Sequence, residues 1–381
     1  MSLETLNHGT MANMKKNLPG ILLLLLLAVP VGLSYYFPQQ SRQLVANIAA
    51  SLLQSIKEHS KTQVSTSAPT PTTPNPPPST EPSASESPTA PEPPNPPVST
   101  IFGLPVPPFF MPPPPPINRP HIGPVEFTKK TISQCPLFET VVQLQDADTF
   151  LDIGLPGAAN HANDASTTYG DEAFEEFVKR CRGAVVVNGT FFSKDDQKRV
   201  MGNMVARGEY LKYSRWENYG TTLGLKSGNK PEMITAREEG QPHWENYWFS
   251  ITCGPRLLKH GQTRVVPDVE GFTDSHVLGI GPRTAIGFSQ AGDKLYLVTF
   301  VNGLSLPDEA HIMKELGCYE AMNMDGGASR ALAHNGAILM KAGRPLTNVI
   351  VVYDSAHHAP DGLRRSWFRF QDGMHPTAPL N

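Results

Sequence analysis

The pattern of apolar and polar positions divides the chain into three kinds of segment. Residues 18–37 are apolar over about the 20 residues that a bilayer-spanning helix requires. Residues 62–124 contain few aliphatic side chains, and short apolar runs bounded by Gly, Asn and Pro then continue over residues 125–354. The pattern therefore predicts one folded domain at residues 125–354, preceded by an anchor and a linker.

Apolar runs within residues 125–354 predict about ten β-strands. The clearest runs cover residues 140–144, 184–187, 221–225, 248–253, 295–301, 319–324 and 349–353. Apolar side chains at helical spacing predict two main helices, at residues 171–182 and 307–318. The expected fold is α+β, a single mixed-sheet domain with two main helices.

The flanks of the apolar segment at residues 18–37 predict its orientation. Lys15 and Lys16 precede it, and Arg42 is the only early cation after it. The positive-inside rule then places residues 1–17 in the cytoplasm and the globular domain on the extracytoplasmic side of the membrane. A cleaved signal peptide is the alternative, and it also implies export.

The segments on either side of the predicted domain have distinct compositions. Residues 38–61 carry apolar side chains at four-residue spacing, which predicts an amphipathic stem. Residues 62–124 are rich in Pro, Ser, Thr and Glu and cannot bury enough apolar surface to offset chain entropy, so a disordered, Pro-rich linker is expected. Residues 355–381 are predicted to form a loose polar tail.

Composition excludes some functions and leaves others open. The formal net charge of −3 and the lack of a basic stripe argue against nucleic-acid binding. The four cysteines are widely spaced without a C-x-x-C pair, which disfavours zinc and allows either two disulfides or free buried thiols. No ligand spacing requires a cofactor, although loop carboxylates and asparagine carbonyls could hold Ca²⁺.

The most informative loop follows the apolar run at residues 319–324. It begins with Asp325, Gly326 and Gly327 and continues to Ser329. Adjacent glycines let backbone N–H groups converge on an anion, and an acid beside them is well placed to face a substrate. A tight hairpin turn is the alternative interpretation.

Other polar residues also come at the ends of predicted strands. Asn188 and Gly189 follow the strand at 184–187, and Phe192 could form a pocket wall. Arg283 lies at the mouth of a strand, where it could bind phosphate or carboxylate in a bidentate manner or make a surface salt bridge. Together with Asn302 and Arg344, these residues predict one pocket assembled from several loops.

Six motifs resemble, in order and approximate spacing, those of the phosphodiester glycosidase family. They are VVVNGTFF, CGPRLLKHG, PRTAIGFS, LYLVTFVNG, EAMNMDGGASRAL and RPLTNVIVV. The resemblance spans about residues 135–354 and implies an exported α+β domain that hydrolyses a glycosyl phosphodiester at the anomeric carbon. The positions that match the family's motifs are Asn188, Gly189, Arg283, Asp325, Gly326, Gly327, Ser329 and Arg344.

Two positions depart from the family's pattern. Thr190 replaces the second glycine of NGGFF, and Asn302 stands where the family often has an acid. If that acid is catalytic in the family, this chain would be slow or altered in substrate preference.

The residue types suit the implied chemistry. A phosphate monoester leaves with little protonation, so charge stabilisation by Arg283 and the Gly326–Gly327 amides matters most, with Asn188 as a third catalytic candidate. Asp325 would act either as a base or as a nucleophile. Gly189, Phe192, Asn302, Ser329 and Arg344 are expected to bind the substrate.

The sequence therefore predicts an exported, membrane-anchored hydrolase that cleaves sugar-1-phosphate linkages in envelope or extracellular glycans. A non-catalytic module that binds glycan or phosphate on a stalk is the main alternative. An adhesive or structural envelope protein is the third. Neither alternative predicts turnover.

Overall fold

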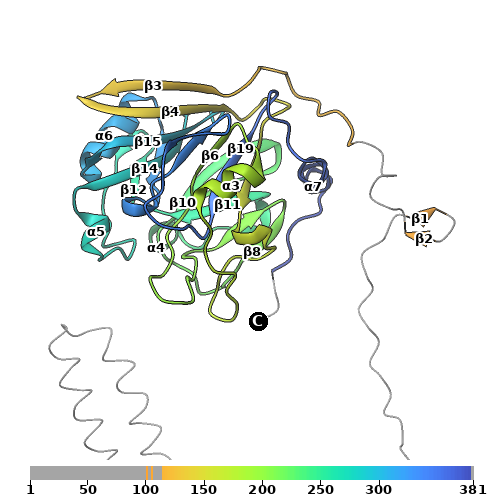
Figure 1. Ribbon diagram of the computed structural model, residues 1–381, viewed down its shortest axis with the longest axis horizontal. Coiled ribbons are helices and arrows are strands. Elements are labelled where there is room, and N and C mark those ends of the chain that lie inside the picture. Colours follow the sequence, from red (N-terminus) through yellow and green to blue (C-terminus); the bar gives the residue numbers. More distant parts are fainter. Residues whose placement is uncertain (1–99, 102–103, 106–113, 379–381) are drawn as a thin grey trace, which may run out of the picture. The chain divides into compact units, whose positions relative to one another are not determined.

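The computed structural model of this chain describes residues 100–101, 104–105 and 114–378 (Figure 1). The predicted anchor at 18–37, the stem at 38–61 and most of the linker lie outside these residues. Within the described part, no helix has both the length and the apolar character needed to cross a membrane. Two short strands of the linker, β1 (Thr100–Ile101) and β2 (Leu104–Pro105), pair with each other in antiparallel fashion.

Residues 114–378 contain three antiparallel sheets. The largest has seven strands in the order β13 (Gln262–Thr263), β12 (Arg256–Lys259), β16 (Glu320–Asn323), β14 (Gly281–Phe288), β15 (Lys294–Leu304), β4 (Cys135–Gln143) and β3 (Glu126–Ile132). One five-stranded sheet has the order β18 (Ala337–Met340), β17 (Leu332–His334), β6 (Val185–Asn188), β19 (Val349–Tyr353) and β5 (Phe150–Gly154). The other has the order β10 (Pro231–Thr235), β9 (Thr221–Leu225), β11 (Phe249–Cys253), β7 (Met204–Ala206) and β8 (Glu209–Lys212).

Three longer helices accompany the sheets. They are α3 (Phe174–Cys181), α6 (Leu306–Glu315) and α7 (Asp361–Gln371), and single turns form α4 (Ala236–Glu239) and α5 (Ser275–Leu278). Short 3₁₀ turns lie at Pro156–Ala158, Ser227–Asn229, Trp244–Asn246 and Gly327–Ser329. Helix α6 begins where the Ser305 hydroxyl accepts a hydrogen bond from the amide of Asp308 at 3.3 Å, with Pro307 in the first turn.

The core joins all three sheets. Val186 of β6, Ile251 of β11 and Ile286 of β14 belong to one cluster of buried apolar side chains. Helix α6 packs on the seven-stranded sheet through a second cluster that includes Ala310 and Met313, and Figure 1 shows it beside β14 and β15. These rigid layers hold the ends of several strands in fixed positions, which is what a site built from loops requires.

The α+β class is confirmed, and the structure corrects the prediction in detail. Three antiparallel sheets replace the single mixed sheet, because many of the short strands pair across hairpins. The strands predicted at 221–225 and 349–353 have the observed bounds of β9 and β19. Strand β3 escaped prediction because its side chains are largely exposed and show no apolar alternation.

The expected loose tail is also corrected. Helix α7 buries Leu363, Trp367 and Phe370, whose spacing places them on one face of the helix. The indole of Trp367 donates a hydrogen bond to Asn229 Oδ1 at 3.1 Å, and the Arg119 guanidinium lies 4.7 Å from its ring centroid. The tail is therefore part of the packed domain as far as residue 378.

All four cysteines lie in the described region and are free thiols. Cys135, Cys253 and Cys318 are buried, and burial raises the pKa of each thiol above its ordinary value. The sequence allowed either disulfides or free buried thiols, and in the structure the cysteines are free thiols. A buried thiol with a raised pKa is a poor nucleophile, so these cysteines serve as small apolar core residues.

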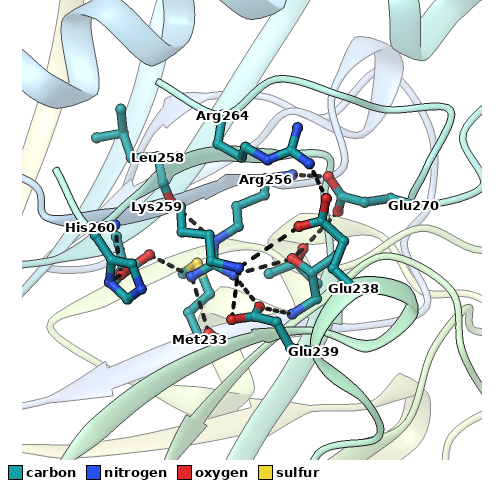
Figure 2. Close-up of polar contacts among 12 residues, drawn as sticks. Met233, Glu238, Glu239, Arg256, Leu258, Lys259, His260, Arg264 and Glu270 are labelled. Carbon is teal, nitrogen blue, oxygen red and sulfur yellow. Dashed lines mark hydrogen bonds and ion pairs between the residues drawn. The ribbon is translucent and has the colours of Figure 1, made fainter. Parts of the chain in front are cut away.

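Arg256, from the CGPR motif, is the centre of a buried ion-pair cluster between two sheets (Figure 2). Its guanidinium is 1% exposed and contacts the carboxylates of Glu239 and Glu320 at 2.5 and 2.6 Å. It also donates to Thr235 Oγ1 and to the carbonyl oxygens of Met233 and Leu258, each at 3.2 Å. Because these acceptors surround it, Arg256 links β10 and α4 to the seven-stranded sheet and is a structural residue.

Candidate active site

A cavity of about 540 Å³ lies where loops from several strands meet. Six of the residues predicted for the site line it: Phe192, Arg283, Asp325, Gly326, Gly327 and Arg344. They come from segments separated by up to about 150 positions in the sequence. The prediction that distant loops converge on one pocket is therefore met for these six residues.

The Asp325 loop is shaped by its neighbours in the seven-stranded sheet. Strand β16 lies between β12 and β14 and ends at Asn323, after which the Met324 amide donates to the Thr284 carbonyl at 2.7 Å. A Cβ atom at Gly326 would lie 2.3 Å from the Pro282 carbonyl oxygen, so only glycine fits there. Gly327 has a φ of +56°, which also favours glycine, and the chain then turns so that Asp325 faces the cavity.

Asp325 is held in an arginine–serine clamp. Its Oδ2 atom accepts a hydrogen bond from Nη2 of Arg344 at 3.1 Å. Nε of the same guanidinium donates to the Ser329 hydroxyl at 2.7 Å. The Arg344 guanidinium carbon lies 4.2 Å from the ring centroid of Phe192, which adds a cation–π contact. Arg344 is thus the arginine that neutralises Asp325, while about a third of its side chain stays exposed.

Burial controls the ionisation of Asp325. The residue is 5% exposed, and burial raises the pKa of its carboxyl from the ordinary 3.8 to about 6. Hydrogen bonding to Ser329 and the charge of Arg344 oppose this rise. The carboxyl therefore titrates close to neutral pH, a range in which a side chain can both accept and release a proton during a reaction.

Arg283 lines the cavity, but its Nε and Nη2 donors are directed elsewhere. Its Nε atom donates to the Leu304 carbonyl at 3.2 Å, and its Nη2 atom donates to the carbonyls of Val277 at 2.9 Å and of Gly279. Val277 belongs to α5, and the cavity wall includes Val277, Ile280, Gly281 and Pro282. Arg283 therefore fixes this wall, which differs from the free anion-binding role that the sequence predicted.

Glu309 of α6 is the acidic neighbour of Arg283. It is fully buried, and neither of its carboxylate oxygens has a hydrogen-bond partner among the described residues. Its Oε2 atom is 3.8 Å from Arg283 Nε. Burial raises the pKa of the Glu309 carboxyl to about 8, although the charge of Arg283 lowers it. The predominant form at neutral pH is therefore the uncharged acid.

Asn188 and Gly189 do not line the cavity, and they support the residues that do. The Asn188 amide group donates to the Asp325 carbonyl at 2.6 Å, and its Oδ1 atom accepts from the Ala331 amide at 3.0 Å. A Cβ atom at Gly189 would lie 1.9 Å from Asn348 Oδ1. Because both ends of the Asn188 side chain are occupied, the structure places it as a brace between β6 and the Asp325 loop.

The two residues that depart from the family's pattern, Thr190 and Asn302, lie outside the cavity lining. Thr190 is buried, and its hydroxyl donates to the Thr252 carbonyl while its amide donates to Asn348 Oδ1 at 2.7 Å. Asn302 is exposed on β15 and does not line the cavity. Neither residue therefore changes which carboxylates the cavity contains.

Two cavity groups escaped the sequence analysis. Asn323 is fully buried, donates to the Gly254 carbonyl at 2.8 Å and has an Oδ1 atom without a partner among the described residues. Asn323 ends a buried strand, as Asn188 does, and this position is the feature of the sequence by which it could have been predicted. Asp274 lies at the cavity mouth beside His276 and 3.5 Å from Lys194, in a loop without a recognisable motif.

The described residues offer no ready metal centre. No group of three or more His, Cys, Asp and Glu side chains is arranged to hold a metal ion in this part of the chain.

Part of the chain matches a known protein family. Residues 182–353 match the model of the phosphodiester glycosidase family. This span contains every residue that the motifs selected for the site. A search of curated proteins finds no match to the chain.

Several solved structures resemble this fold at low sequence identity. A protein from Synechocystis is 15% identical with a TM-score of 0.44, over 60% of this chain and 61% of that one. The zebrafish N-acetylglucosamine-1-phosphodiester alpha-N-acetylglucosaminidase catalytic domain, auto-inhibited by its pro-peptide, is 19% identical with a TM-score of 0.46, over 62% and 85%. A protein described as exported, from Burkholderia pseudomallei, is 13% identical with a TM-score of 0.42, over 58% and 74%. The family match confirms the resemblance seen in the motifs: residues 182–353 of this chain form a domain of the phosphodiester glycosidase family.

Proposed function

We propose that this chain is an exported, membrane-anchored hydrolase that cleaves glycosyl phosphodiester linkages in envelope or extracellular glycans. The observation that carries the proposal is the buried Asp325 carboxyl, clamped by Arg344 at the wall of a 540 Å³ cavity. A cavity of this size can hold a sugar with its phosphodiester. The family match supports the same reaction class.

The proposed reaction breaks the bond between the anomeric carbon and the phosphate oxygen. Water supplies a hydroxyl group to the sugar, and the electron pair of the broken bond leaves with the phosphate as a monoester. The leaving phosphate gains charge during this step. Arg344 and the backbone amide of Gly327, on the cavity lining, would stabilise that charge, while the hydrogen bond of the Gly326 amide goes to the Asp325 carboxyl.

Asp325 would act at the anomeric carbon. As a base it would take a proton from the attacking water, and as a nucleophile it would bond transiently to the anomeric carbon. Retaining and inverting glycosidases differ in the separation of two carboxylates. Asp274, at the cavity mouth, is the second acid on the cavity wall, and hydrogen bonds from His276 lower the pKa of its carboxyl. The stereochemistry of the released sugar distinguishes the two roles of Asp325.

Substrate hydroxyl groups would be bound by the remaining cavity groups. Asn323 Oδ1 is a buried acceptor that lacks a partner among the described residues, and it belongs to a residue that lines the cavity. A sugar hydroxyl that donates to it would remove the cost of leaving this atom unpaired. Phe192 would contribute an apolar wall on which one face of a sugar ring can pack.

The placement of the domain outside the cytoplasm rests on the sequence. The apolar segment at residues 18–37 and its flanking charges support an anchor with the domain on the extracytoplasmic side. The main alternative function, a binding module without turnover, drew on the Asn302 departure. Asn302 lies away from the cavity lining, so this departure no longer favours the alternative.

The test is a turnover assay on the purified full-length chain in detergent, with a panel of sugar-1-phosphodiesters. The proposal predicts release of free sugar and a phosphate monoester in equal amounts. Asp361→Asn, which changes an exposed carboxylate on α7, serves as a control and should keep the native rate. Tight binding of panel members without any product would contradict the proposal and favour the binding module.

A further inference from the structure

A second cavity, of about 700 Å³, adjoins the proposed active site. Met201 and Tyr219 line both cavities. The segment at residues 191–202 contributes to both as well: Phe191, Phe192 and Lys194 face the first cavity, while Ser193, Arg199 and Val200 face the second. The two cavities are therefore neighbours on opposite sides of one loop, and a ligand longer than one sugar phosphodiester could occupy both.

The intervening loop is held in place by backbone hydrogen bonds. The Met201 amide donates to the Phe191 carbonyl at 2.8 Å, and the Ser193 amide donates to the Arg199 carbonyl at 2.8 Å. Phe192 and Val200 pair as an isolated antiparallel bridge. The second cavity thus has a fixed wall in common with the first, and its shape does not depend on an irregular loose segment.

The charges in the second cavity balance. Lys212 and Arg199 supply two cations, and Asp164 and Glu217 supply two acids. Lys212 Nζ lies 3.4 Å from Glu217 Oε2, and both side chains are largely buried. A second phosphate would require an excess of positive charge, so a neutral ligand fits this lining better.

The lining also has the groups that bind a polyhydroxy ligand. Lys212 Nζ donates to the Gly202 carbonyl at 2.8 Å and to Glu217, which leaves one of its three N–H groups for a ligand. Tyr213 and Tyr219 supply aromatic rings with polar tips. Trp216 lies on the same loop, between two residues that line the cavity, and is 76% exposed.

We propose that the second cavity is a subsite for a neutral sugar unit next to the phosphodiester, so that the natural substrate is an oligosaccharide or polymer. This proposal rests on the proposed function, because it assigns the second cavity to the same substrate. The shared wall of Met201 and Tyr219 places the sugar unit directly beside the reacting group. Chain length of the glycan, as well as the linkage, then determines specificity.

The test compares substrates that differ only in length. The short substrate is a sugar-1-phosphodiester with a methyl group on the phosphate, and two extended substrates carry one more neutral sugar, either on the phosphate or on the first sugar. The native full-length chain is expected to show a kcat/KM at least about tenfold higher for one extended substrate. Equal kcat/KM values for all three substrates would overturn the proposal.

Two variants link this preference to the cavity. Ala165 is exposed on the cavity lining, so Ala165→Trp adds bulk there without removing a core contact, and it should abolish the preference for the extended substrate. Tyr213→Ala should reduce the preference by removing a ring, and its thermal unfolding is measured because Tyr213 packs on Tyr210 and Trp244. Ala291→Trp, in the exposed β14–β15 turn, is the matched control and should retain the preference. A preference that survives Ala165→Trp would overturn the proposal.

Binding measurements separate this proposal from the proposed function. If none of the three substrates is turned over, the proposed function fails, and calorimetric titration of the same compounds still tests the subsite. The subsite predicts tighter binding of an extended compound than of the short one, and loss of that difference in Ala165→Trp. Equal binding of the short and extended compounds would reject the subsite.

Discussion

Arg256 and Arg344 both contact an acidic side chain, but their surroundings differ. Arg256 is 1% exposed and donates to two carboxylates, a hydroxyl and two carbonyl oxygens, in the cluster seen in Figure 2. Arg344 contacts Asp325 and Ser329, and about a third of its side chain remains exposed beside a cavity. The first arrangement is closed on all sides, whereas the second leaves an arginine and a carboxyl available to a ligand.

Burial and hydrogen-bond satisfaction therefore separate a structural arginine from one that is available to a ligand in this domain. Arg283 falls between the two cases: it lines the cavity, but three carbonyl oxygens accept hydrogen bonds from its Nε and Nη2 atoms. We assign it to positioning of the α5 wall. Variants of Arg256 and Arg344 test whether these two environments behave as differently as their contacts indicate.

The largest expected effect is on stability, from Arg256→Met. Removing the guanidinium leaves the buried Glu320 carboxylate without its arginine, while Glu239 keeps Lys259 at 2.9 Å, and breaking such a buried pair costs about 3–5 kcal/mol of unfolding free energy. Denaturant unfolding measures this change. Arg365→Met, which removes a half-exposed cation 4.0 Å from Asp361, is the control and should change stability little. An unfolding free energy unchanged in Arg256→Met would contradict the structural assignment.

Arg344→Met should mainly affect catalysis. Loss of the cation that faces the leaving phosphate should lower kcat by about 10²–10³-fold, as for other charge-stabilising donors. Its effect on stability should be small because the side chain is partly exposed. Arg344→Lys keeps the charge but loses the two-point contact with Asp325 and Ser329, so an intermediate rate is expected. Native kcat in Arg344→Met would remove Arg344 from the mechanism.

The pH dependence tests the environment of Asp325. If the ionised carboxyl is required, kcat/KM falls about tenfold for each pH unit below about 6, where its raised pKa lies. Arg344 lowers this pKa, so Arg344→Met should move the acidic limb to higher pH. A limb that stays in place in this variant would show that the titrating group is not Asp325.

The raised pKa of Asp325 also predicts how the stability of the folded chain changes with pH. Because the folded-state pKa of Asp325 lies above its ordinary 3.8, its stabilising contribution is complete below pH 3.8 and is lost as the pH rises through about 6. The native chain should therefore lose stability relative to Asp325→Asn between pH 4 and pH 7. Unfolding curves of both proteins across this range measure the difference.

Glu309→Gln should have the smallest effect. Below about pH 4.5 the Glu309 carboxyl is uncharged in both the folded and the unfolded chain, and glutamine has a similar shape, so stability should change by less than about 1 kcal/mol there. Between about pH 4.5 and pH 8 the native chain should lose stability and the variant should not. A loss of several kcal/mol in the variant at pH 7 would indicate that Glu309 is ionised and paired with Arg283.

The sequence indicated much of the fold because the buried strands and the two main helices carry strong periodic patterns. Strands β9 and β19 and helices α3 and α6 were all anticipated. Strand β3 was not, since its largely exposed residues depend on pairing with β4. Helix α7 carried a signal in the spacing of Leu363, Trp367 and Phe370, but the polar composition around them concealed it.

The sequence predicted which loops line the cavity better than it predicted the role of each side chain. The sequence selected loops that do meet at one cavity, because polar residues at strand ends are seldom placed there for packing. It could not show that the donors of Arg283 are taken by Val277 and Leu304, or that Asn188 braces the Asp325 loop. These contacts join segments far apart in sequence, and local pattern contains no information about them.

The most direct test of the central claim is the turnover of a sugar-1-phosphodiester by Asp325→Asn. The account predicts that kcat falls by at least about 10³-fold, while the variant unfolds at a temperature equal to or above that of the native chain at pH 7. A folded Asp325→Asn protein that retains the native kcat would contradict the account.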